Sequence, residues 1–93
     1  MALSPQQGVV VGTTAVRLDS DPHDNNAGAR FMAVAQGAGT VVLGGSDSVT
    51  AGNGCRVPVV AGTIITEQLD QGEQVWAIVA SGSITFDVLM GGV

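Results

Sequence analysis

The stretch VWAIVASGSITFDVLM, residues 75–90, decides the fold of this chain. Its first part, residues 75–80, is apolar throughout, and in its last part Ile84, Phe86 and Val88 alternate with polar or other outward-facing positions. Strict alternation of this kind is typical of a β-strand with one buried face. Because only a short Ser-Gly-Ser segment separates the two parts, the stretch predicts an antiparallel hairpin.

Shorter runs of β-branched and apolar residues precede this stretch and are separated by segments rich in glycine or in aspartate and asparagine. They cover residues 8–18, 30–36, 40–43, 49–51, 55–61 and 64–69. Three small residues join residues 30–36 to residues 40–43, which predicts a second hairpin. Pro58 lacks the N–H that a ladder needs, so we expect residues 55–61 at a sheet edge or in a loop.

Glycine shapes the expected turns. Gly12 interrupts the first β-branched run and indicates a bulge or kink there. The pair Asn53-Gly54 is the one favoured in type I′ turns. Residues 37–39 and 44–45 resemble a phosphate loop only superficially, because β-branched residues follow them where a nucleotide-binding loop is followed by a helix.

The fold class follows from this pattern. No window repeats apolar residues at helical spacing, so six to eight short strands predict an all-β chain, a small antiparallel β-sandwich or barrel. We expect a single β domain over residues 8–93, preceded by a flexible N-terminal arm at residues 1–7. The expected core comprises Met32, Val34, Val41, Leu43, Ile65, Leu69, Trp76, Ile78, Ile84, Phe86 and Val88.

Composition excludes several classes of protein. A chain of 93 residues that is 45% hydrophobic and 12% charged fits one folded domain and not a disordered chain. No apolar stretch approaches the roughly 18 residues of a transmembrane helix. The net charge of −5 opposes binding to nucleic acid and to anionic membrane surfaces. The N-terminus lacks the features of a secretion signal, and a lone cysteine suits a reducing compartment such as the cytoplasm.

Acidic residues gather around the only histidine, His23, and make Asp19, Asp21 and Asp24 weak candidates for a calcium site. The first two have the spacing of a helix-flanked calcium loop. That motif needs glycine where Asp24 stands and glutamate where Arg30 stands, so it fails. A turn whose side chains bond their own backbone is favoured, and we predict neither a metal nor a cofactor.

A nucleophilic site would combine His23 with Cys55, Ser46 or Ser81. No serine lies in the glycine-flanked elbow that activates a nucleophile, and no helix is expected after one. Cys55 is interpreted as a small buried hydrophobe beside a strand. We therefore predict no catalytic residue and no enzymatic activity.

Several short motifs follow one another in a recognisable order. They are VGTTA at residues 11–15, VVLGGS at 41–46, NG at 53–54, GE at 72–73 and VWAIVASG at 75–82. This order resembles that of small virion proteins of tailed bacteriophages, over roughly residues 9 to 90. Two positions depart from the resemblance, because Trp76 stands where the similar sequences carry leucine and Cys55 where they carry an aromatic residue.

The resemblance implies a virion structural protein that decorates the capsid shell and stabilises it. Its partner would be the major capsid protein, bound where capsid subunits meet, and the chain would be made in the host cytoplasm. Self-association is also implied, with three subunits expected because capsid lattices offer local three-fold positions. The expected partner contacts are Trp76 and the arm, which consists of Met1, Ala2, Leu3, Ser4, Pro5, Gln6 and Gln7.

Two alternatives stay open at this level. The same fold would serve as a tail-tip, fibre or other virion-surface module that binds host or tail protein. A calcium-assisted carbohydrate-binding module built on residues 19–26 is the third hypothesis. Such modules stack sugars on exposed aromatic rings, of which this chain has few, since it carries no tyrosine and one tryptophan.

Overall fold

The computed structural model describes residues 3–19, 29–69 and 73–91. These residues form eight β-strands and no helix. The strands are β1 (Leu3–Val11), β2 (Val16–Arg17), β3 (Ala29–Ala35), β4 (Gly39–Gly44), β5 (Cys55–Val59), β6 (Ile64–Leu69), β7 (Trp76–Ile78) and β8 (Ile84–Gly91). The predicted all-β class is confirmed.

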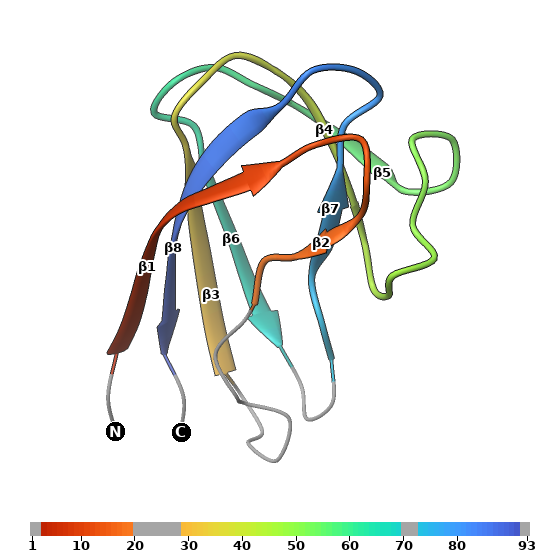
Figure 1. Cartoon of the computed structure of the whole chain (residues 1–93). Coiled ribbons are helices and arrows are strands. Elements are labelled where there is room, and N and C mark those ends of the chain that lie inside the picture. The colour runs from red at the N-terminus through yellow and green to blue at the C-terminus, as the bar shows by residue number, and fades with distance from the viewer. Residues whose placement is uncertain (1–2, 20–28, 70–72, 92–93) are drawn as a thin grey trace.

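The strands form two four-stranded sheets whose neighbours are all antiparallel. Sheet A has the order β1-β8-β3-β6, and sheet B has the order β2-β7-β4-β5. The two sheets form separate layers (Figure 1), and one hydrophobic cluster draws residues from both. The fold is therefore a small antiparallel β-sandwich, the first of the two predicted architectures.

Both predicted hairpins are wrong as strand pairs. β7 and β8 lie in different sheets, and so do β3 and β4. The short connections at residues 79–83 and 36–38 carry the chain from one layer to the other. Gly82 in the first connection has a φ of 72°, and Gly39, directly after the second, has a φ of 152°. Alternation along a strand shows that one face is buried, but it does not show whether the next strand lies beside it or across the core.

The connection between β4 and β5 also differs from expectation. These strands do pair, but residues 49–51 form no strand. Asn53 has no positive φ, so Asn53-Gly54 is not a type I′ turn. Instead, Oδ1 of Asn53 accepts a hydrogen bond from the N–H of Thr50 at 2.7 Å. The asparagine side chain thus shapes this connection in place of the predicted turn.

The core prediction is confirmed in part. Val41, Leu69, Ile84, Phe86 and Val88 are buried, and Leu43 and Ile65 are partly buried against the same cluster. Met32, Val34, Trp76 and Ile78 are not in it, because they are half-buried on the outer faces. Their neighbours Phe31, Ala33, Ala35, Val75, Ala77 and Val79 face inward instead. Because both faces of β3 and β7 carry apolar residues, the apolar pattern does not show which face is buried.

The N-terminal segment differs from the expected arm. β1 begins at Leu3, which lies opposite Gly91, and the pairing continues to Gln6 opposite Val88. Residues 3–7 are therefore strand residues, because β8 extends far enough to supply a partner backbone. The pairing shifts between Gln6 and Val9, where Gly8 has a φ of +73°. The bulge predicted at Gly12 thus lies at Gly8; Met1 and Ala2 lie outside the described residues.

Candidate functional site

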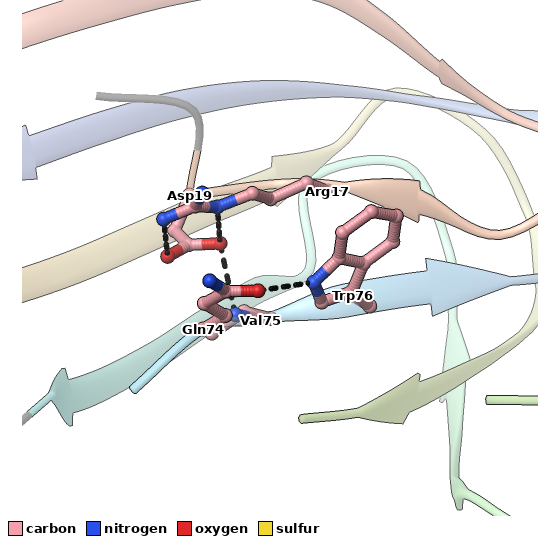
Figure 2. A network of polar contacts seen from close by, with 5 residues as sticks. All are labelled: Arg17, Asp19, Gln74, Val75 and Trp76. Atoms are coloured by element: carbon pink, nitrogen blue, oxygen red, sulfur yellow. Dashed lines mark hydrogen bonds and ion pairs between the residues drawn. The ribbon is translucent and has the colours of Figure 1, made fainter. Parts of the chain in front are cut away.

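A buried carboxylate organises the polar contacts at one end of sheet B. Asp19 is 0% exposed, and Oδ1 accepts hydrogen bonds from Nε of Arg17 at 3.0 Å and from the N–H of Val75 at 2.9 Å. Oδ2 accepts a second bond from the Arg17 guanidinium at 3.2 Å. Figure 2 shows the carboxylate between the arginine and the backbone of Val75. A fork of this kind is among the stronger arrangements for an ion pair.

The network links segments that are far apart in the chain. Leu18 donates its N–H to the carbonyl of Val75 at 2.8 Å, so the backbone supports the same link as Asp19. Beside it, Nε1 of Trp76 donates to Oε1 of Gln74 at 2.8 Å. The bonds of Leu18 and Asp19 to Val75 fix β2, which is only two residues long, against the start of β7. The arrangement is that of a structural tie.

This geometry bears on the calcium candidates. Both oxygens of Asp19 already accept hydrogen bonds, so binding a cation there would require the Arg17 pair to break. Asp21, Asp24 and His23 lie outside the described residues. Within the part of the chain that the structure describes, no three His, Cys, Asp or Glu side chains gather as metal ligands would.

The three candidate nucleophiles, Cys55, Ser46 and Ser81, are all exposed. Cys55 is exposed at the first residue of β5, so its interpretation as a buried residue is wrong. An edge strand leaves one side open, and the first residue of such a strand has few neighbours. Oγ of Ser46 lies 2.6 Å from Oγ of Ser48 within the connection from β4 to β5, while Ser81 is exposed between β7 and β8.

The outer face of sheet A carries an apolar cluster that the sequence analysis assigned to the core or overlooked. We call it the outer cluster; it consists of Met32, Val34, Ile64 and Leu89. Leu89 lies opposite Met32, and Val34 lies opposite Ile64, so the four residues are neighbours across three strands. Ile64 is 58% exposed and the other three are half-buried. The signal was present in ARFMAVA, where apolar residues occupy both faces of one strand.

A groove of about 630 Å³ lies over the ends of β3, β6 and β8 beside this cluster. Its lining includes Arg30, Met32, Thr66, Gln68 and Leu89. Together with the carboxylate of Glu67, which also lines the groove, one guanidinium, one hydroxyl and one amide provide contacts for a polypeptide surface.

The predicted partner contacts fall on two different sheets. Pro5, Gln6 and Gln7 are exposed on β1 of sheet A. Trp76 is half-buried on the outer face of sheet B, with its indole N–H bonded to Gln74. A partner that binds only one of the two sheets would therefore not contact both Trp76 and the exposed residues of β1.

Comparison with known proteins does not identify a family for this chain. No protein-family model matches the chain, and no curated protein matches it. One solved structure, described as "Bacillus endospore appendages form a novel family of disulfide-linked pili", aligns with a TM-score of 0.49 at 12% identity, over 95% of this chain and 85% of that chain. This likeness is too weak to support an inference. As for membranes, the described residues include no helix that could cross one.

Proposed function

We propose that this chain is a non-enzymatic virion structural protein of a tailed bacteriophage that decorates and stabilises the capsid shell. The observation that carries the proposal is the ordered series of motifs, which follows that of small phage virion proteins over roughly residues 9 to 90. The structure adds a surface suited to protein contact, the outer cluster with its adjoining groove.

The motifs coincide with places where the backbone packs closely. A Cβ on Gly44, in the LGGS motif, would lie 2.6 Å from Cγ2 of Val49. A Cβ on Gly54, in the NG motif, would lie 2.5 Å from Cγ1 of Val42. Such distances leave no room for a side chain, so these glycines are needed for the path of the chain. The shared motifs therefore describe a shared backbone path, which supports a shared fold with the virion proteins.

The mechanism would be mechanical. A decoration protein adds contacts between neighbouring capsid subunits, and many modest contacts act together on a shell that carries many copies. The outer cluster would contribute apolar surface to such a contact, and Arg30 and Gln68 would contribute hydrogen bonds at its rim. The partner would be the major capsid protein, and none of these contacts requires a substrate.

The experiment that tests this role is a reconstruction of the phage particle that contains the chain. Density for the sandwich on the outer surface of the head, between capsid subunits, is the expected result. Density confined to the tail would replace this role with that of a tail-tip or fibre module. Absence of the chain from purified particles would overturn both assignments.

The predicted contacts can be tested separately by binding the purified chain to heads that lack it. We expect Trp76→Ala or a double change of Pro5 and Gln7 to alanine to weaken binding at least about tenfold if these places touch the capsid. Asp47→Ala, on an exposed connection of sheet B, is the matched control and should bind as the parent does. Binding unchanged in both variants would remove these residues from the contact.

A further inference from the structure

The sandwich has four edge strands, β1 and β6 in sheet A and β2 and β5 in sheet B. An edge strand exposes unpaired N–H and C=O groups that can pair with another chain, and proteins usually block such edges. Prolines, bulges, short strands, charged side chains and side-chain caps are the common means. The four edges of this chain differ in whether they carry such a block.

Three of the edges are blocked. β1 contains Pro5, which has no N–H, and the N–H of Gly8 at its bulge donates to Oδ1 of Asp87 at 3.0 Å. β5 contains Pro58, and directly after it the N–H of Val60 donates to Oγ1 of Thr63 at 3.0 Å. β2 is only two residues long. None of these edges offers a continuous row of donors and acceptors.

β6 contains no proline, bulge or side-chain cap among its six residues, and its single charged residue, Glu67, lies opposite Phe31 of β3. The direction of its peptide groups follows from β3, because N–H groups of successive residues in a strand point to opposite sides. Ala35 donates toward the β6 side, to the carbonyl of Thr63 at 2.8 Å, and Gln36 donates toward β8, to the carbonyl of Thr85 at 2.8 Å. Odd-numbered residues of β3 therefore bond toward β6.

The partners of those odd-numbered residues in β6 are Ile65, Glu67 and Leu69. The peptide groups of the remaining residues, Ile64, Thr66 and Gln68, consequently point away from β3 to the open edge. All three side chains are exposed on the outer face of sheet A. The open edge thus presents three successive donor and acceptor sites with no proline or bulge between them.

We propose that β6 pairs with β6 of a second copy of this chain, antiparallel about a two-fold axis at Thr66. In this register Thr66 faces Thr66, and Ile64 of each copy faces Gln68 of the other. Every outward-pointing peptide group of Ile64, Thr66 and Gln68 then meets a partner, and two four-stranded sheets become one continuous sheet. This inference is independent of the virion role.

The side chains favour this register over its neighbours. Glu67 is the only charged residue of β6, and here it faces Ile65 of the other copy. A shift that sets Glu67 against Glu67 would oppose like charges. A shift the other way, with Ile65 against Ile65, leaves the peptide groups of Gln68 unpaired. The chosen register also places the exposed Ile64 beside the stem of Gln68.

A closed dimer follows from the blocked edges. A ring or filament through this sheet would have to pair β6 with a different edge, and β1 interrupts its row at Pro5 and Gly8. Contacts between identical patches about a two-fold axis close after two copies, whereas a trimer needs two different patches that fit each other. The sheet edge therefore favours two copies over the three expected from the resemblance.

Light scattering coupled to size-exclusion chromatography tests the proposal on the full chain at rising concentration, up to about 1 mM to include weak association. We expect a mass approaching twice 9.3 kDa. Thr66→Lys and Thr66→Glu each set like charges against each other at the axis and should be monomeric, while an equal mixture of the two should recover the dimer. Circular dichroism should show that both variants stay folded.

Ser81→Lys adds the same charge on the exposed connection between β7 and β8 and should dimerise as the parent does. A parent that stays monomeric at the highest concentration would overturn the proposal, as would a parent of trimeric mass. A dimer that survives Thr66→Lys, or a mixture that does not recover it, would also place the contact elsewhere. Each of these results leaves the location of the chain on a virion untouched.

Discussion

The two sheets of this sandwich are stabilised in different ways. Sheet A consists of strands of six to nine residues that pair along nearly their whole length. Sheet B includes β2 and β7, of two and three residues, and depends on contacts that its strands alone do not provide. Asp19 fixes β2 to β7, and two glycines allow the connection after β4 to pack closely. Regular pairing is thus sufficient for one layer, while the other requires individual side chains.

The largest effect is expected in sheet A from Phe86→Ala. Phe86 is 0% exposed in the centre of β8, and removing its ring should lower the free energy of unfolding by about 3–5 kcal/mol. Urea denaturation followed by fluorescence or circular dichroism would measure it. Thr85→Ala, the neighbour on the outer face, is the control and should cost less than about 1 kcal/mol. Equal losses would mean that the faces of β8 are assigned wrongly.

Asp19→Ala should produce the largest effect in sheet B. It leaves the N–H of Val75 and the guanidinium of Arg17 without this acceptor, and we expect a loss of about 2–4 kcal/mol. Arg17→Ala should cost a comparable amount, because it leaves the carboxylate of Asp19, which is 0% exposed, without this counter-ion. A double-mutant cycle would separate the ion pair from the backbone bond. An unchanged stability for Asp19→Ala would show that β2 does not need this tie.

The third prediction concerns two glycines in the connection from β4 to β5. A methyl group on Gly54 would lie 2.6 Å from the carbonyl oxygen of Leu43, so Gly54→Ala should cost about 1–3 kcal/mol. Gly45 has nothing within 4 Å of the same position, and Gly45→Ala should leave stability nearly unchanged. Thermal unfolding of the two variants side by side measures the difference. Similar melting temperatures would argue against a close approach at Gly54.

The smallest effect is expected from Trp76→Phe. This change keeps an aromatic ring on the outer face of sheet B and removes the hydrogen bond from Nε1 to Gln74, so it should cost about 1 kcal/mol. A loss as large as that of Phe86→Ala would instead assign Trp76 to the core. Chemical denaturation monitored by circular dichroism suits this variant, which lacks the only tryptophan.

The sequence predicts the strands well and their partners poorly. Residues 30–36 and 64–69 correspond closely to β3 and β6, and Pro58 lies on an edge strand as expected. These results depend on local chemistry, such as alternation and a missing N–H. Pairing depends on the direction in which a short turn sends the chain, and the same Ser-Gly-Ser segment suits a hairpin or a crossing between sheets.

The candidate site shows the same limit. In the sequence, Asp19 is one of several acidic residues in a polar segment. Its hydrogen-bond partner Val75 lies 56 residues further along the chain. No sequence pattern near Asp19 predicts that contact. The open edge at β6 is easier to predict from the sequence, because IITEQL contains neither proline nor glycine. Its significance appears only when the other edges are seen to be blocked.

The pairing of β1 with β8 has a consequence for how the protein is made. The first strand of the sandwich joins the sheet only through the last one, since β8 is its sole neighbour in sheet A. A ribosome must therefore complete nearly the whole chain before LSPQQGVVV finds its place. Before that point β3 can pair with β6, but the core still lacks β8 and its buried residue Phe86. The complete sandwich should thus form only after synthesis of β8, and its rate of formation should depend on closing the long loop between β1 and β8.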